Sequence, residues 1–241
     1  MFAILKKEIN TFFASATGYL VIAVFLLLNG LFLWVFKGNF NVFDYGFADL
    51  SAFFFLAPWI LTFLIPAITM KSFSDEARMG TLEVLLTRPI HPIHIVLGKY
   101  LGAFTLVVLA LLPTLLYILT LWKLGKPEGN LDLGSVLGSY VGLLFMASAY
   151  TAAGIFASTL SRNQIVSFII AAAICFFLFF GFEGIASLGS EMNWISQLGM
   201  KAHFESMARG VIDTRDLIYF LSLAAFFVLL TSEQLKKTGN A

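Results

Sequence analysis

Six long apolar runs dominate this chain and leave little room for any other architecture. A helix that crosses a bilayer needs about 20 mostly apolar residues, and six segments of the 241-residue chain meet that requirement. They cover about 17–36, 52–70, 99–121, 134–160, 164–182 and 216–233. Only 12% of the residues are charged, against about 25% in soluble domains. The sequence predicts an all-α integral membrane protein, in which residues 1–241 form one transmembrane domain.

The distribution of Lys and Arg predicts how the chain is oriented. An even number of spans puts both termini on one side of the membrane. That side holds nine Lys and Arg residues and the other side holds six. Because basic residues favour the cytoplasmic side, we expect both termini in the cytoplasm. The net charge of +1 gives no electrostatic reason to expect a nucleic-acid partner.

The first fifteen residues are too short and too polar to span. Phe2, Leu5, Ile9 and Phe12 recur at helical spacing, which indicates an amphipathic helix. We expect this helix to lie in the cytoplasmic interface ahead of the first span. The alternative is a frayed terminus with no fixed place.

Ionisable side chains are nearly absent from the predicted spans. Lys99 stands at the entrance of the third span and Glu233 at the end of the sixth. Ion-coupled carriers and channels usually need a charged group at membrane depth, so the pattern disfavours these classes. Scattered polar groups, such as Ser148, Tyr150 and Thr151, fit a hydrophobic or very large cargo, or no cargo.

Residues for catalysis or for a bound cofactor are not evident. There is no G-x-x-x-x-G-K-[ST] loop for ATP phosphates, and Cys175 is the single cysteine. His91 and His94 could share a metal, but Pro92 lies between them and no further ligand is near in sequence. We therefore expect no enzymatic activity, no metal site and no directly bound cofactor. If the function of the chain requires ATP hydrolysis, another polypeptide must supply it.

Glycines recur at four-residue spacing at the starts of two spans. They are Gly134, Gly138 and Gly142 in the fourth span, and Gly98 and Gly102 in the third. Small residues at i and i+4 let helix backbones approach closely in lipid. The spacing predicts close helix packing, either within one chain or between subunits.

A short charged segment, "SFSDEARMGTLEVLLTRP" at 72–89, interrupts the apolar sequence between the second and third spans. Gly80 punctuates it, Thr81 is the predicted N-cap of a short helix, and Pro89 ends that helix. Glu83 points away from the apolar face of this helix. That face is formed by Leu82, Leu85 and Leu86. Charges of both signs precede it at Asp75, Glu76 and Arg78. A partner that docked here could move two spans together, whereas the plain alternative is an ordinary loop.

The stretch "EARMGTLEVLLTRPI" resembles the coupling segment of ABC-2 type exporter permeases, which lies between their second and third spans. The shared residues are Glu76, Gly80, Thr81, Leu82, Glu83 and Pro89. The resemblance covers the whole chain, including the N-terminal helix, the six spans, the basic turn "SRNQ" at 161–164 and outer helices between spans 5 and 6. Importer permeases carry their coupling motif in the last cytoplasmic loop, which is only this short turn here.

Two further stretches are more specific. "HFESMARGVIDTRDLIYFLS" at 203–222 and "FDYGFADLSAFFFLAPWILTFLIPAITMKSFSDEARMGTLEVLL" at 43–86 are similar to the membrane subunit of the gliding-motility-associated ABC transporter of Bacteroidota. This resemblance implies a permease subunit in the bacterial inner membrane that serves export or an envelope function in gliding.

The family implies partners as well as a fold. A separate cytoplasmic ATPase subunit, which holds ATP and Mg, would bind the coupling segment of each of two permease-type chains. The second chain would be a copy or a related auxiliary subunit with a periplasmic domain. Two functions stay open, namely substrate export and a non-transporting scaffold or mechanical coupler of an envelope machine.

Contacts with these partners can be assigned to named residues as expectations. Leu82, Leu85 and Leu86 would fill a groove on the ATPase, with Glu83 setting their register. Arg162 would make a second contact or serve as a positive-inside anchor. At the outer surface Phe204 suits the interface. Four charges near it would order the outer helices by ion pairing or meet a periplasmic partner: Arg209, Asp213, Arg215 and Asp216.

Overall fold

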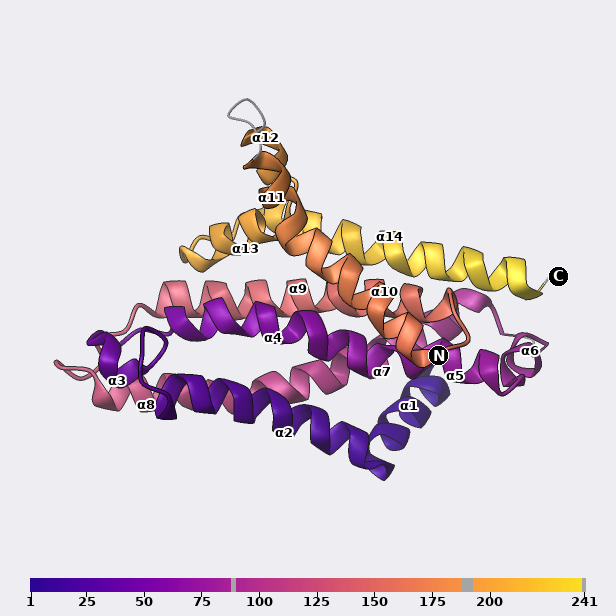
Figure 1. Ribbon diagram of the computed structural model, residues 1–241, viewed down its shortest axis with the longest axis horizontal. Helices are drawn as coiled ribbons and strands as arrows, with labels where there is room; N and C mark the ends of the chain where they lie inside the picture. Colours follow the sequence, from indigo (N-terminus) through magenta and orange to yellow (C-terminus); the bar gives the residue numbers. More distant parts are fainter. Residues whose placement is uncertain (88–89, 188–192, 240–241) are drawn as a thin grey trace.

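The computed structural model describes residues 1–87, 90–187 and 193–239, and in these ranges it contains helices and no strands (Figure 1). The first half of the chain forms α1 (Phe2–Ala14), α2 (Ala16–Gly30), the π-helix η1 (Leu31–Val35), α3 (Val42–Tyr45), α4 (Ser51–Thr69), α5 (Lys71–Arg78) and α6 (Thr81–Leu86). The second half forms α7 (Pro92–Leu111), the 3-10 helix η2 (Leu112–Thr114), α8 (Leu115–Leu124), α9 (Leu133–Thr159), α10 (Gln164–Phe176), the π-helix η3 (Phe177–Gly181), α11 (Phe182–Ala186), α12 (Asn193–Ser196), α13 (Met200–Ala208) and α14 (Thr214–Gly239).

Six of the described helical stretches are long and apolar enough to cross a membrane, as predicted. They are Ala16–Val35, Ser51–Arg78, Pro92–Leu124, Leu133–Thr159, Gln164–Ala186 and Thr214–Thr238. Several of these helices extend beyond the predicted spans, and the third begins at Pro92 rather than near residue 99. The prediction located the apolar part of each helix. The backbone hydrogen bonding of a helix continues past that part, and proline is well suited to its first position.

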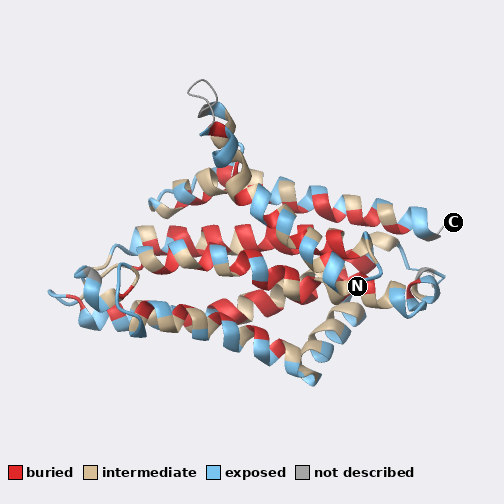
Figure 2. Ribbon diagram, viewed as in Figure 1, coloured by how far each residue is buried: buried red, intermediate tan, exposed pale blue. Residues whose placement is uncertain are grey.

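Helix α9 forms the centre of the bundle. Its most apolar stretch is 78% buried, against 22% for the stretch that contains α10, and it packs against α4, α7, α10, α13 and α14. Many of its residues are Gly, Ala or Ser, which allows close helix approach. A Cβ at Gly154, for example, would lie 2.1 Å from Thr69 Oγ1 of α4. Buried residues therefore concentrate on α9 and the helices around it (Figure 2).

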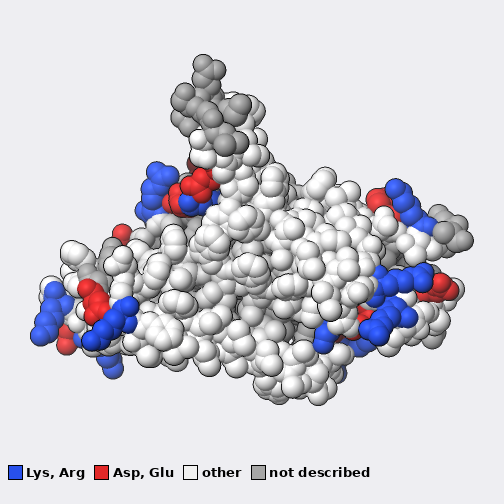
Figure 3. All heavy atoms as spheres, viewed as in Figure 1, with Lys and Arg blue, Asp and Glu red and all other residues white. Residues whose placement is uncertain are grey.

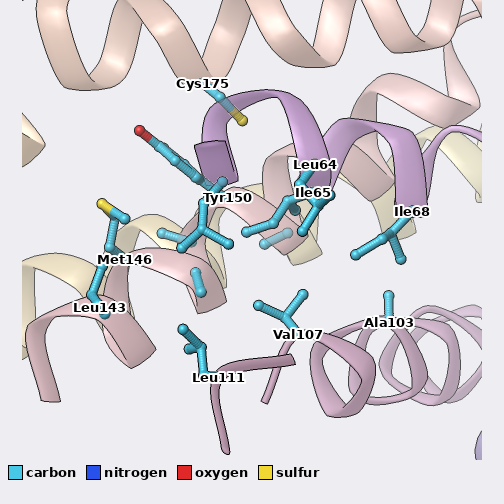
Figure 4. Packing of buried hydrophobic residues seen from close by; sticks show 14 of the residues in the cluster. Leu64, Ile65, Ile68, Ala103, Val107, Leu111, Leu143, Met146, Tyr150 and Cys175 are labelled. Carbon is cyan, nitrogen blue, oxygen red and sulfur yellow. The ribbon is translucent and has the colours of Figure 1, made fainter. Parts of the chain in front are cut away.

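One part of the core lies where α4, α7, α9 and α10 meet (Figure 4). Leu64 and Ile68 of α4, Val107 of α7 and Met146 of α9 belong to one cluster of buried apolar residues. Tyr150 is fully buried in this cluster, and its hydroxyl accepts a 3.3 Å hydrogen bond from Thr62. The polar side chains of the fourth span therefore have hydrogen-bond partners within the chain. The Ser148 hydroxyl, for example, is hydrogen-bonded to the Tyr100 hydroxyl at 2.6 Å.

The bundle is elongated and has two ends (Figure 1). Both termini, α5 and α6 lie at one end, called the proximal end below, while α3, α8 and α13 lie at the other, distal end. On the face shown in Figure 3, Lys, Arg, Asp and Glu gather at these two ends and a broad band between them carries none. A band of this kind is the surface that a bilayer requires.

Helix α1 is an ordered element and packs along α7. The contact is close at two glycines, where a Cβ would lie 2.9 Å from Ile4 at Gly98 and 2.7 Å from the Glu8 Cβ at Gly102. Phe2 is exposed, whereas Leu5, Ile9 and Phe12 are partly buried. The four residues predicted to share one helix face do lie on a helix, and this helix contacts α7 through Ile4 and Glu8. The frayed-terminus alternative is therefore wrong.

Candidate functional site

The charged segment between the second and third spans forms two short helices at the proximal end. Helix α5 continues α4 after Met70, and Gly80 separates it from α6 with a positive φ of 69°. Glycine adopts this conformation without the steric cost of a Cβ. Thr81 is not the N-cap as predicted, because Gly80 takes that position and the Thr81 hydroxyl donates to the Glu76 carbonyl at 3.3 Å. The predicted helix stop at Pro89 lies outside the described residues.

The apolar face of α6 turns toward the chain's own core. Leu82 is only 8% exposed and joins the core cluster, and Leu85 is partly buried against it. The expectation that these leucines fill a groove on a partner is wrong for Leu82, because an apolar face packs on the nearest apolar surface available. The side chain of Leu86 lies outside the described residues.

A different set of side chains on this segment is exposed. Met79 is 67% and Val84 59% exposed, and Arg78, Thr81 and Glu83 are exposed beside them. This surface, called the α5–α6 surface below, combines two apolar side chains with charges of both signs. That composition is common in protein–protein contacts, where apolar anchors are surrounded by a polar rim.

Helix α5 also contacts a buried lysine. Lys99 of α7 is 2% exposed, and its ammonium donates to Glu8 Oε1 of α1 at 3.0 Å, Glu76 Oε1 of α5 at 2.8 Å and the Ser72 carbonyl at 2.7 Å. An ammonium has three N–H donors, so each is used. The Phe73 ring lies 5.0 Å from the same nitrogen, within cation–π range.

The Lys99 junction, which consists of Lys99, Glu8 and Glu76, joins three elements. Glu8 and Glu76 are separated from Lys99 by 91 and 23 residues in the sequence. Exposed Lys7 adds a 3.3 Å contact to Glu76. Taking charges out of water is costly unless they are paired and hydrogen-bonded. The junction therefore fixes α1, α5 and α7 relative to one another.

The same end brings a second loop beside α5. Gln164, at the start of α10, hydrogen-bonds Asp75 through its side-chain amide, and α5 packs on both α9 and α10. Arg162 lies exposed in the turn between α9 and α10. Asp75 and Glu76 therefore have structural partners, whereas Arg162 and the α5–α6 surface are available for contacts outside the chain.

The sequence predicts only that Lys99 stands at a span entrance, and it indicates no role for the side chain. Two signals were present, namely a lysine between Gly98 and Gly102 and a glutamate within the amphipathic N-terminal segment. The glycines remove side-chain bulk where α1 approaches, so that Glu8 reaches the lysine. Nothing local in the sequence pairs these two residues.

At the distal end the predicted ion pairs differ from those observed. Among the described residues, Asp216 pairs with His203, at 2.7 Å between Oδ1 and Nδ1, and not with Arg209 or Arg215. Asp213 instead accepts a hydrogen bond from the Arg215 backbone N–H at the start of α14, as a helix-capping aspartate does. Buried Asp216 requires a nearby partner, which α13 supplies, while the exposed charges remain solvated.

The glycine series of α9 packs against the segment around α13. A Cβ at Gly138 would lie 2.2 Å from the Met207 carbonyl oxygen, and one at Gly142 would lie 3.0 Å from the Phe204 ring. Gly134 is approached by Gly210, where a Cβ would lie 2.9 Å from the Gly134 carbonyl carbon. The close approach seen here is within one chain.

The architecture as a whole shows which class of protein this is. Six apolar helices around a buried core, charged ends and an apolar band describe a multi-pass membrane protein. The model of a protein family described as ABC-2 family transporter protein matches residues 2–238. The chain therefore belongs to the ABC-2 transporter family and is a permease subunit of an ABC transporter, which works in a lipid bilayer with a separate ATPase subunit. No curated protein matches the chain.

Proposed function

We propose that the ATPase subunit binds the α5–α6 surface and that the Lys99 junction carries its movement into the membrane helices. The single observation that supports this proposal is the burial of Lys99 between Glu8 and Glu76. Because these charges are hydrogen-bonded in a buried site, separating them is costly. A displacement of α5 is therefore transmitted to α1 and α7 together rather than absorbed between them.

The path on either side of the junction is also short. Helix α5 follows α4 after one residue, Met70, so a force on α5 acts directly on the second span. Met79 and Val84 are the apolar anchors for the ATPase, and Glu83 between them sets the register. Arg162 makes the second contact. Asp75 holds the neighbouring turn through Gln164 and keeps the two contact regions in one surface.

The arrangement has consequences for the whole complex. The chain lies in the bacterial inner membrane. Its proximal end faces the cytoplasm, so both termini are cytoplasmic. ATP and Mg are bound by the ATPase subunit. A second permease-type chain, either a copy or a related auxiliary subunit, completes the complex.

The proposed process is gliding motility. Its support is the similarity of residues 203–222 and 43–86 to the gliding-associated permease subunit. Export and mechanical coupling would both be driven by the ATPase subunit at the proximal end. They differ only in whether a cargo crosses the membrane. The core hydroxyls, such as those of Tyr150 and Ser148, are partnered inside the chain, which favours a hydrophobic cargo over a polar one.

The direct test is co-purification of the native complex in a mild nonionic detergent. We expect Glu83→Lys and Val84→Asp to reduce the ATPase subunit recovered with the chain about tenfold or more, because interface anchors carry most of the binding energy. Glu128→Lys is the matched control, since Glu128 is exposed near the distal end. Equal recovery of the ATPase with all three variants would show that the subunit docks elsewhere.

The gliding assignment has its own test. A strain that carries Val84→Asp should lose gliding, whereas a Glu128→Lys strain should glide normally. Normal gliding after deletion of the whole chain would contradict this assignment and leave the ATPase-docking proposal standing.

A further inference from the structure

A cavity opens at the distal end, far from the coupling segment. It lies between the starts of α4 and α9, the η3–α11 region and α13, and its volume is about 610 Å³. Pockets for small ligands in proteins range from about 300 to 1,000 Å³. The space is therefore large enough for one small amphiphile.

Part of the cavity lining, called the aromatic wall below, consists of Phe54, Phe55 and Trp59 of α4, Phe179 and Phe180 of η3, and Phe204 of α13. The Trp59 and Phe180 ring centroids are 4.0 Å apart. This wall suits an alkyl or aromatic body, and the electron-rich face of Trp59 can also interact with a cation.

The rim of the cavity is acidic. Four carboxylates line it, from Asp49, Asp132, Glu183 and Glu205, against the single ammonium of Lys201. Lys201 is held by Glu183 at 2.6 Å and lies 3.8 Å from Glu205. These five side chains carry a formal net charge of −3.

Two of the rim carboxylates already have a structural task. Asp49 accepts hydrogen bonds from the Ser51 backbone N–H and hydroxyl, and Asp132 accepts one from the Ser135 N–H. Each sits at a helix start, where the helix dipole partly offsets its charge. Glu205 is different, because its only cation contact among the described residues is the long one to Lys201. Unneutralised negative charge therefore remains next to the aromatic wall.

We propose that this cavity binds an amphiphile with an apolar body and a primary-amine headgroup. The body lies against the wall around Trp59, and the ammonium lies at the rim near Glu205. An anionic amphiphile of the same length would meet excess negative charge and bind more weakly. The proposal concerns the distal cavity alone and does not depend on how the ATPase docks.

The test uses tryptophan fluorescence of the intact chain in a nonionic maltoside detergent. The probes are a terminally brominated undecylamine and the brominated undecanoic acid of the same length, because bromine quenches nearby indoles. We expect the amine to quench saturably at concentrations about tenfold lower than the acid. Trp59→Phe should remove this saturable component, since Trp59 is the cavity's only tryptophan among the four in the chain.

The rim is tested by Glu205→Gln, which changes an exposed side chain and should preserve the fold. It should weaken amine binding about fivefold, the size expected for one partly exposed ion pair. Glu128→Gln, which lies outside the cavity lining, should leave amine binding unchanged. Equal quenching by the acid and the amine, or an amine signal that persists in Trp59→Phe, would mean that the probes only partition into the micelle and would overturn the proposal.

Discussion

At the scale of single residues, Lys99 is a buried charge that joins α1, α5 and α7. It is buried within a membrane helix and hydrogen-bonded to two carboxylates and a carbonyl. Such a group stabilises the fold only while its partners are in place. Its removal leaves Glu8 and Glu76 close together without their shared cation.

We expect Lys99→Met to lower the apparent melting temperature by about 10 °C, which corresponds to a loss of about 3–5 kcal/mol from a broken buried ion pair. The measurement is thermal unfolding of the detergent-solubilised chain. Lys37→Met is the control, because Lys37 is exposed and its loss should change stability by less than about 0.5 kcal/mol.

A neutral version of the junction separates stability from coupling. Lys99→Met combined with Glu8→Gln and Glu76→Gln should recover much of the lost stability, since no buried charge then lacks a partner. Under the proposed function this triple variant still binds the ATPase subunit but transmits its movement poorly. A triple variant as unstable as Lys99→Met alone would show that the electrostatic explanation is wrong.

At the scale of elements, the contact between α9 and α13 depends on the absence of side chains. The Met207 carbonyl lies where a Cβ of residue 138 would be placed, at 2.2 Å. Backbone cannot move aside as a flexible side chain can. Helix α13 is therefore held against α9 by this close packing, and against α14 by the Asp216–His203 pair.

We expect Gly138→Ala to destabilise the protein by about 1–3 kcal/mol through overpacking, measured by the same thermal unfolding assay. Gly30→Ala is the matched control, because nothing lies within 4 Å of a Cβ there. In that control a helical alanine should be neutral or stabilising by up to about 1 kcal/mol. Equal effects of the two substitutions would contradict the close-contact interpretation.

At the scale of the whole molecule, the separation of charge into two ends makes the orientation testable. Cys175 is the chain's only cysteine and is buried, so cysteines introduced at exposed positions should give site-specific labelling. In intact cells with a permeable outer membrane, a membrane-impermeant maleimide should label Glu128→Cys and spare Glu83→Cys. Labelling of Glu83→Cys with protection of Glu128→Cys would show that the proposed orientation is inverted.

Much of this architecture could be predicted from the amino-acid sequence, because the bilayer acts on local composition. Six apolar runs of sufficient length predict six helices wherever water is excluded, and all six are present. The helical spacing of residues 2–12 and the break at Gly80 also depend on near neighbours in the chain. Both the helix α1 and the break between α5 and α6 were therefore predictable.

The partners of particular side chains required the folded chain. Helical periodicity identified an apolar face on α6, but whether Leu82 met a partner or the protein's own core depended on how α6 folds back. Glu8 meets Lys99 across 91 residues, and the distal cavity takes its lining from four separate regions. Helix packing brings together residues that are far apart in the sequence. Local sequence patterns could therefore not have revealed these contacts.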